Sequence, residues 1–405
     1  MNSVRAKAPV RTLSPVLVVG TGLLGTSIGL GLRRLGVDVM LRDLSPTAMR
    51  LAADYGAGRI APADRATDAQ PEDTPRLVVV CVPPDAVGTV VLEQLRNWPD
   101  AIVTDVASVK TLPLEVLRAG GGDVSRYVGS HPMAGRETGG PLSGRADLFL
   151  GRPWVITSTP ETTVDSLQEV EGMALDLGAS VVNLTAEDHD ESVALISHVP
   201  QLVSSVMAAQ LLGDNLDAAN LAGGGLRDVT RIAASDPTMW NQILAANGSR
   251  VARILRNIAG DIGTLADALD DIEAEGARRV VADQMRAGNE GVARIPGKHG
   301  SRRTYASVTV MVDDRPGQLA RLFNEIGEAD INVEEIMLEH SPGANLGLVE
   351  VWVLPEVRQR LVDDLDSRGW RVAQYPKQPR PQPALRKKND AKPPDCRDRR
   401  PLGVG

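Results

Sequence analysis

The sequence predicts a doubly wound α/β domain, followed by an all-helical domain and a small α+β domain. Three observations support this fold class. Short apolar runs alternate with amphipathic stretches over residues 14–185, helical periodicity without β-branched runs follows over residues 188–288, and a mixed strand and helix pattern occupies residues 304–376. A chain of 405 residues has room for these three domains.

The first domain is predicted from six candidate strands. The first four are short, apolar and rich in Val or Ile, as buried parallel strands are. Helical patterns lie between several of the six, which is typical of β-α-β units in a doubly wound sheet. The candidate strands are Val16–Val19, Val37–Leu41, Leu77–Val82, Ile102–Asp105, Tyr127–Gly129 and Trp154–Thr157.

A glycine loop joins the first strand to the first helix. Gly20-Thr21-Gly22-Leu23-Leu24-Gly25 fits the pattern G-x-G-x-x-G and opens a helix over Thr26–Leu35. Glycine permits the tight turn and lets the backbone approach a pyrophosphate, which the helix N-terminus then faces. This context predicts a Rossmann-type, dinucleotide-binding sheet.

The second strand indicates which dinucleotide binds. Asp43 stands at its end, where an acid accepts hydrogen bonds from a ribose 2′-hydroxyl and repels a 2′-phosphate. This favours NAD, although the neighbouring Arg42 leaves NADP open. The candidate cofactor-binding residues are Gly20, Gly22, Leu23, Leu24, Gly25, Asp43, Val82, Pro83 and Asp105.

Polar residues gather where the predicted strands end, which is where ligands bind in open α/β sheets. Ser108 follows the Ile102–Asp105 strand and is either a site residue or a helix cap. Pro132 disfavours helical backbone at His131 and so holds it extended at a strand end. Because histidine titrates near neutral pH, His131 is a candidate for proton transfer.

The helical domain carries a second polar group. Arg231 lies close to a glycine run, Gly223–Gly225, where a buried arginine is a natural carboxylate clamp, although salt bridges also use arginine. Pro200 must kink its helix or free a carbonyl, and Asp236-Pro237 starts a new helix. The apolar helical region is short and would gain core by pairing, so we expect a homodimer.

The sequence pattern of the third domain predicts a small ββαβ-type sandwich. Its predicted elements are a strand over Tyr305–Val312, a helix over Gln318–Ala329, strands over Val333–His340 and Gly347–Leu354, a helix over Glu356–Arg368 and a short strand near Arg371–Gln374. The expected divisions of the chain are a flexible N-terminus (1–13), the dinucleotide-binding domain (14–185), the helical domain (186–290), a linker (291–303), the third domain (304–376) and a disordered tail (377–405).

Composition excludes several classes of function. The net charge of −8 provides no basic field for nucleic acid. Two cysteines, Cys81 and Cys396, are too few for a disulfide framework or a zinc cluster, and the histidines have no metal-binding spacing, so we expect no metal. Cys81, in an apolar run, reads as a buried, inert thiol. With neither a charge-free membrane span nor a signal peptide, a reducing cytoplasm is expected.

Taken together, these motifs resemble the prephenate/arogenate dehydrogenase family of tyrosine biosynthesis. The resemblance covers about residues 15–290 and rests on Gly20–Gly25, Asp105–Lys110, His131–Gly135, Ser197–Gln201 and Thr230–Ala233. It implies that NAD+ takes a hydride from C4 of a cyclohexadienol, a base accepts the hydroxyl proton, and the ring carboxylate leaves as CO2.

The resemblance also implies a role for each candidate residue. His131 would accept the hydroxyl hydrogen bond, Ser108 would orient His131 and the hydroxyl or the nicotinamide, and Arg231 would hold a substrate carboxylate. Glu137 resembles the family's gating acid. The other implied residues are His189, Ser197 and His198, lining the nicotinamide and substrate pocket, Gln201, meeting the substrate side chain, and Gly224, Asp228 and Trp240, reaching across the dimer interface.

The third domain resembles an ACT regulatory domain, a module that commonly binds amino acids between two copies. The resemblance is carried by Asp314–Leu319 and Asp330–Val333, and the candidate regulatory residues are Asp314, Pro316, Gly317 and Asn332. It implies feedback by an aromatic amino acid, with tyrosine the natural guess and phenylalanine or tryptophan open.

Three alternatives stay open. Neutral Gln201 favours prephenate over arogenate, whose amine would pair with an acid, but other residues could supply that acid. A non-catalytic NAD(H)-binding regulator would not need His131, Ser108 and Arg231 together. A β-hydroxyacid dehydrogenase would carry a lysine base in its helical domain, and residues 186–277 contain no lysine.

Overall fold

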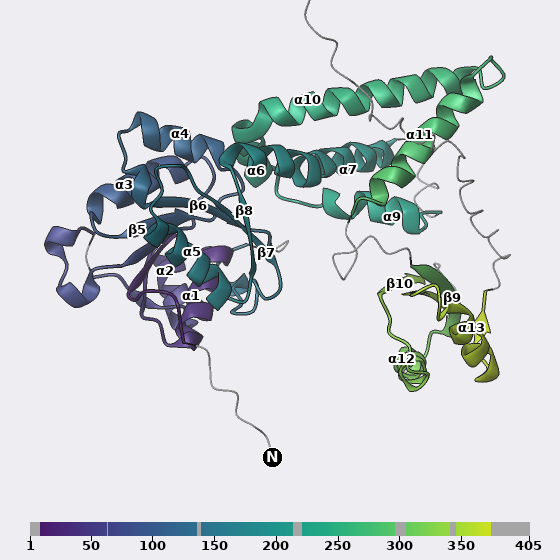
Figure 1. Cartoon of the computed structure of the whole chain (residues 1–405), viewed down its shortest axis with the longest axis horizontal. Helices are drawn as coiled ribbons and strands as arrows, with labels where there is room; N and C mark the ends of the chain where they lie inside the picture. The colour runs from purple at the N-terminus through teal and green to yellow at the C-terminus, as the bar shows by residue number, and fades with distance from the viewer. Residues whose placement is uncertain are drawn as a thin grey trace, which may run out of the picture. The chain divides into compact units, whose positions relative to one another are not determined.

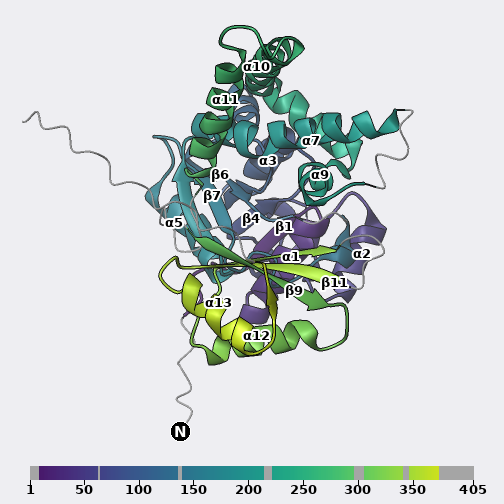
Figure 2. The same cartoon turned by 90° about the vertical axis from the view of Figure 1, so that its right-hand side faces the viewer.

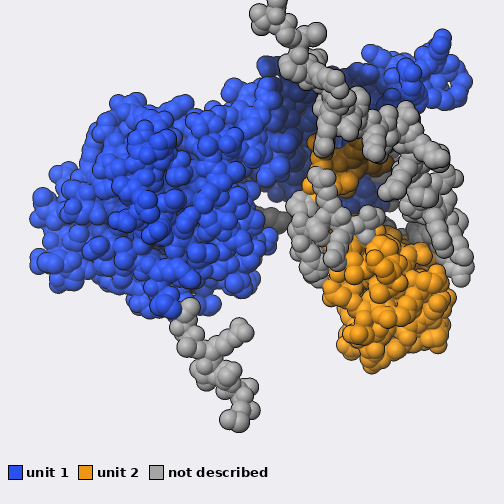
Figure 3. Space-filling view, viewed as in Figure 1, with its two compact units in different colours: residues 1–288 blue, residues 289–405 orange. Residues whose placement is uncertain are grey.

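The computed structural model describes residues 9–62, 64–135, 139–213, 221–295, 305–340 and 346–373. Figure 1 shows the elements in chain order. The chain divides into two compact units, residues 1–288 and 289–405 (Figure 3). The first unit contains the α/β and helical domains, and the second contains the small α+β domain.

The α/β domain is built on an eight-stranded sheet in the order β3-β2-β1-β4-β5-β6-β7-β8. Neighbouring strands are parallel except β6 and β7, which are antiparallel. The strands are β1 Val16–Val19, β2 Val39–Arg42, β3 Arg59–Ile60, β4 Leu77–Val80, β5 Ile102–Asp105, β6 Tyr127–Pro132, β7 Pro153–Thr157 and β8 Ser180–Leu184. This order confirms the predicted doubly wound sheet.

Two strands were missed by the sequence prediction. β3 has only two residues, and β8 is an edge strand with no buried residue, so neither shows the continuous apolar run of a buried strand. The second predicted strand was also placed too early, since β2 begins at Val39 rather than at Val37.

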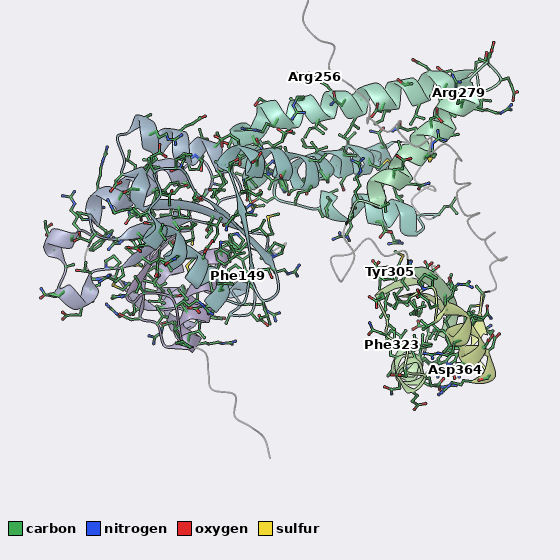
Figure 4. The ribbon with its side chains drawn as sticks, viewed as in Figure 1. Phe149, Arg256, Arg279, Tyr305, Phe323 and Asp364 are labelled. Atoms are coloured by element: carbon green, nitrogen blue, oxygen red, sulfur yellow. The ribbon has the colours of Figure 1, made fainter. Side chains whose placement is uncertain are left out.

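Helices cover both faces of this sheet, which explains why consecutive residues of the central strands β1 and β4 are all apolar. Val16 and Val18 pack with α1 and α5 on one face, and Leu17 and Val19 pack with α3 and α4 on the other. Phe149 lies inside this domain against Trp154, with ring centroids 4.9 Å apart (Figure 4). The helices are α1 Leu23–Leu35, α2 Pro46–Asp54, α3 Val87–Asn97, α4 Thr111–Ala119 and α5 Val164–Asp176.

Residues 11–13, the end of the segment predicted to be flexible over residues 1–13, are hydrogen-bonded to α5. Asp176 on α5 accepts hydrogen bonds from the backbone N–H groups of Arg11 and Thr12, at 2.8 and 2.9 Å. Glu169, about two turns earlier on the same face of α5, accepts from the N–H of Leu13 at 2.7 Å. Residues 11–13 are therefore fixed to α5, while residues 1–8 lie outside the described part of the chain.

The helical domain confirms the predicted helices and the effect of Pro200. A π-helical turn, η5 (Ala194–His198), separates α6 (Ala186–Val193) from α7, and Pro200 lies in the first turn of α7. Asp236 caps the helix that begins at Pro237, as expected. The remaining bounds are α7 Val199–Ala209, α9 Gly224–Thr230, α10 Pro237–Asp270 and α11 Ala277–Val292. Short 3-10 turns occupy Ala66–Asp68, Pro71–Asp73, Val124–Arg126, Pro141–Ser143, Gln210–Leu212 and Arg231–Ala233.

The helical domain buries little apolar surface of its own. Among the described residues its core cluster holds only Ala194, Val199, Val251 and Ile254 as buried members. Ala277 is the one buried residue of α11, which turns back from the end of α10 (Figures 1 and 2). Much of the apolar surface of α7, α10 and α11 is consequently left exposed.

One continuous helical stretch, Ala186–Leu212, is long and apolar enough to span a membrane by length and composition. It also carries Asp190, which accepts hydrogen bonds from the backbone of Lys110 and Thr111 at 2.8 and 2.9 Å. The stretch therefore packs on the α/β domain through a buried acid.

The second unit has the order βαββαβ, which corrects the predicted ββαβ type. The elements themselves were predicted to within two residues at each end: β9 Ala306–Asp313, α12 Gln318–Glu328, β10 Glu335–His340, β11 Leu346–Val353, α13 Arg358–Ser367 and β12 Arg371–Val372. They form an antiparallel sheet in the order β10-β11-β9-β12. Alternate valines of β9 and β11 pack against Leu322 of α12 and Leu361 of α13, so both helices cover one face. Residues 296–304 and the predicted tail, with Cys396, lie outside the described residues.

Candidate active site

The glycine loop between β1 and α1 has the geometry of a dinucleotide site. Gly20 has φ +99°, and a Cβ on it would lie 2.4 Å from the carbonyl oxygen of Cys81. A Cβ on Gly25 would lie 1.9 Å from the carbonyl oxygen of Gly20. A Cβ on Gly22 would meet nothing within 4 Å, so packing does not explain this glycine. The open space at Gly22, before a helix with no acid in its first turn, fits a pyrophosphate.

Asp43 and Arg42 point to different partners. The Asp43 carboxylate accepts hydrogen bonds from the backbone N–H and the hydroxyl of Thr21, at 2.6 and 2.8 Å, and so stands against the glycine loop. The guanidinium of Arg42 turns to Asp64, 3.1 Å away. An acid at the loop with the arginine engaged elsewhere favours a free ribose 2′-hydroxyl, as in NAD.

The β4 end adjoins the same loop. Val82 Cγ1 is 3.3 Å from the position of a Cβ at Gly20, so Val82 lies beside the glycine loop, and Pro83 follows it in the chain. Cys81 is half-buried, and burial raises the pKa of its thiol above the ordinary range, in keeping with an inert thiol.

Asp105, which was predicted to bind the cofactor, is fully buried and engaged by other residues of the chain. Its buried carboxylate accepts hydrogen bonds from the N–H of Ala107 at 2.8 Å, from the hydroxyl of Tyr127 at 2.7 Å and from the ammonium of Lys110. Lys110 also donates to the carbonyl oxygen of Ser130 at 2.7 Å, and burial lowers the pKa of Lys110. This cluster holds the ends of β5 and β6 together, directly before His131.

A chain of hydrogen bonds runs from His131 into the helical domain. His131 Nδ1 lies 2.9 Å from His189 Nε2, and His189 Nδ1 lies 2.8 Å from Asp190 Oδ1. Asp190 also accepts the backbone N–H groups of Lys110 and Thr111 at the N-terminus of α4. Burial raises the pKa of Asp190, but the hydrogen bonds from His189 and Thr111 outweigh it and lower the pKa to about 2.

This chain fixes the positions of the protons. Because Asp190 is ionised, His189 carries its proton on Nδ1 and offers a lone pair on Nε2. His131 then donates its own Nδ1–H to His189, which leaves the Nε2 lone pair of His131 free. Burial, with His189 and Lys110 nearby, holds the pKa of His131 well below its ordinary value. His131 is therefore a neutral imidazole that can accept a proton at Nε2.

His198 lies in a second polar contact, between η5 and α10. Its Nδ1 is 3.3 Å from the amide nitrogen of Asn247, and its ring stands edge-on to Trp240 with centroids 6.0 Å apart. Burial lowers the pKa of His198 to about 4, so this ring is also neutral at neutral pH.

The other candidate residues divide into those with assigned contacts and those without. Gln201 donates to the hydroxyl of Ser235 at 2.6 Å, which ties α7 to the segment after Arg231. Arg231 is exposed rather than buried as expected, and within the described part of the chain it makes no ion pair. Ser108 is half-buried and is not the cap of α4, whose N-cap residue is Lys110. Of the residues described, His189 rather than Ser108 hydrogen-bonds to His131. Ser197, Gly224 and Asp228 lie on η5 and α9, and Glu137 lies outside the described residues.

Sequence reasoning missed Lys110, Asp190 and Asn247 as members of the site. Lys110 and Asp190 stand close to residues that were chosen as candidates, but charged side chains are usually exposed. Only the structure shows that both side chains are buried within the site. Asn247 gave no signal, because an asparagine before a glycine in a helical stretch reads as a weak helix position.

A dinucleotide loop at the end of β1 and a neutral histidine with a free lone pair at the end of β6 share one edge of the sheet. This arrangement is that of an NAD-dependent dehydrogenase. Comparison with known proteins identifies the family. The description "Prephenate dehydrogenase, nucleotide-binding domain" matches residues 28–183, and "Prephenate dehydrogenase, dimerization domain" matches residues 185–283.

Individual relatives agree with this assignment. A probable prephenate dehydrogenase, NovF, of Streptomyces niveus is 35% identical over 87% of this chain and 98% of its own length. The crystal structure of prephenate dehydrogenase from A. aeolicus with hydroxyphenyl propionate and NAD+ has a TM-score of 0.61 and 26% identity, over 71% of this chain and 100% of that one. A Synechocystis arogenate dehydrogenase structure has a TM-score of 0.58 and 25% identity, over 68% and 99%. The chain belongs to the prephenate dehydrogenase family.

Proposed function

We propose that this chain catalyses the NAD-dependent oxidative decarboxylation of prephenate to 4-hydroxyphenylpyruvate. The observation that carries the proposal is the Nε2 lone pair of His131, held by His189 and Asp190 at the sheet edge that also bears the glycine loop. Family membership supplies the reaction, and the geometry supplies its base.

The steps assigned to the protein follow from the proton positions. His131 Nε2 accepts the proton of the C4 hydroxyl as the C4–H bond breaks, and the resulting imidazolium is stabilised by Asp190 through His189. The bound NAD+ supplies the hydride acceptor. The ring carboxylate then leaves as CO2, its bonding electrons complete the aromatic ring, and the proton on His131 returns to the phenolate oxygen.

Substrate binding is assigned to the helical domain. Arg231 is proposed to bind a substrate carboxylate, because its guanidinium is exposed and its segment is held against α7 by the Gln201 to Ser235 hydrogen bond. The remaining pocket residues are proposed to be Ser108, Ser197, His198, Gly224, Asp228 and Trp240.

The proposed assembly is a homodimer through the helical domain. Its helices expose Leu195, Ile196, Val206, Met207, Ile262, Leu269, Met285 and Val292. A domain with so small a core gains buried surface by pairing, and its matched family description is that of a dimerization domain. Sedimentation velocity at micromolar concentration should show a dimer, and a monomer there contradicts the proposal.

The second unit is proposed to be an ACT-type regulatory domain for an aromatic amino acid, in a cytoplasmic enzyme. Its βαββαβ order supports this, as does the turn before α12, where Gly317 has φ +87° and Asp314 and Pro316 are exposed. Asn332, after α12, donates to Glu334 at 2.8 Å. Calorimetric titration with tyrosine, phenylalanine and tryptophan tests this assignment, and no heat with any of them contradicts it.

The function is tested by NADH formation. Purified protein with NAD+ and prephenate should produce NADH at a rate well above that with arogenate, because neutral Gln201 lacks the acid that would pair with an amine. No turnover with either substrate would remove the proposed function. Turnover with arogenate alone would make the chain an arogenate dehydrogenase.

A further inference from the structure

Asn247 interrupts the longest helix of the chain at the active site. Its backbone, φ −122° and ψ 18°, is non-helical inside α10, and its side chain is buried. A kink in a helix has a local cause, and here the side chain leaves the helix surface to enter the histidine cluster. The buried amide must then satisfy all of its polar atoms.

Two contacts fix which way round the amide lies. Its nitrogen donates to the carbonyl oxygen of Asp190 at 2.7 Å, and its oxygen accepts from the guanidinium of Arg250 at 3.3 Å. Arg250 itself is held near the carboxylates of Asp190 and Glu191, at 4.0 and 3.9 Å. A flipped amide would place oxygen against a carbonyl and nitrogen against a cation, so only one orientation is compatible with these partners.

This orientation determines the proton on His198. The second N–H of the Asn247 amide points at His198 Nδ1, 3.3 Å away, which must therefore be a lone pair. We infer that Asn247 is a positioning residue that holds neutral His198 in the Nε2–H tautomer, so that His198 offers a hydrogen-bond donor where His131 offers an acceptor.

The two histidines then differ in what they recognise. His131 can accept a hydrogen bond from the hydroxyl of the substrate. His198 can donate one to an oxygen, such as that of a keto or carboxylate group, but cannot accept one from an ammonium group. Asn247 would thereby favour a keto acid over the corresponding amino acid. This functional part rests on the proposed function, whereas the tautomer assignment does not.

Nitrogen NMR of the full-length chain labelled with ¹⁵N-histidine reads the tautomer directly. The chain has five histidines, and a His198→Gln variant assigns the signal. The expected spectrum at neutral pH shows His198 protonated on Nε2 in the wild type. In Asn247→Asp, whose carboxylate can only accept, Nδ1 should carry a proton. A wild-type signal with the proton on Nδ1 overturns the inference, even if the enzyme is fully active.

Kinetics test the functional part. In Asn247→Asp and in Asn247→Leu, the KM for prephenate should rise about tenfold, with a smaller change in kcat, since one hydrogen bond to a bound oxygen is lost. The preference for prephenate over arogenate should fall by a similar factor. The control Asn257→Asp makes the same charge change at an exposed position of α10 and should leave both constants unchanged. An unchanged KM in both Asn247 variants overturns the recognition role. A wild type without turnover removes the proposed function but leaves the NMR result standing.

Discussion

Replacement of His189 by alanine tests the proton relay at its middle member. The variant loses the hydrogen bond between His131 Nδ1 and His189 Nε2, at 2.9 Å, and the link to the Asp190 carboxylate, at 2.8 Å. A neutral hydrogen bond is worth about 1 kcal/mol and one to a charged group about 2 kcal/mol. Together they give about 3 kcal/mol, which is roughly a hundredfold loss in kcat/KM for prephenate.

Matched variants separate the two parts of this loss. In His189→Gln, the amide oxygen can still accept the hydrogen bond from His131, but no N–H replaces the one that His189 donates to Asp190. We therefore expect kcat/KM for prephenate to fall by only about tenfold to thirtyfold. Ser192→Ala removes a hydroxyl that bonds the backbone of the same helix and should have no effect. Initial rates of NADH formation give the constants, and NAD+ affinity should be unchanged in all three variants. A His189→Ala enzyme within about threefold of the wild type would refute the relay.

Three further predictions follow from the structure. Gly22→Ala should keep the wild-type thermal midpoint but weaken NAD+ binding at least tenfold, whereas Gly25→Ala, whose Cβ would meet a backbone oxygen, should lower the midpoint itself; equal midpoints would contradict the packing argument. Arg231→Ala should raise the KM for prephenate roughly thirtyfold to a hundredfold with NAD+ binding intact, while Arg279→Ala, exposed on α11, should not; an unchanged KM would remove the carboxylate clamp. Because burial lowers the pKa of His198 from 6.5 to about 4, the unfolded chain takes up this proton first, and stability is lost as pH falls below 6.5. In urea unfolding, the free energy of unfolding should fall by about 2 kcal/mol between pH 7 and pH 5 because of His198, and the His198→Asn variant should lack this part of the fall. An unchanged pH dependence in the variant would contradict the neutral, buried ring.

The sequence pattern was sufficient to predict the fold of the α/β domain. It also predicted the site residues that stand at a glycine loop or next to a proline. Glycine spacing marks the cofactor loop because only glycine tolerates the close backbone approach at Gly20 and Gly25. His131 could be singled out because Pro132 holds it extended at a strand end. These are local properties, and a local pattern is enough to predict them.

The same reasoning failed where a side chain's direction matters. Asp105 stands at a strand end like a ligand-binding residue, but Lys110 and Tyr127 close over its carboxylate. Ser108 is closer to His131 in the sequence, yet the residue that hydrogen-bonds to His131 is His189, 58 residues away. No periodicity reports such a pairing, because it depends on how α6 lies against the end of β6.

The sequence by itself therefore determined the sheet, the glycine loop and the place of His131 at a strand end. Only the tertiary structure decided which nitrogen of His131, His189 and His198 bears the proton. That assignment needs Asp190 held by backbone N–H groups 79 and 80 residues away, and Asn247 brought to His198 from 49 residues away by a kinked helix. Tautomers follow from hydrogen-bond partners, and in this protein the partners come from separate elements that only folding brings together.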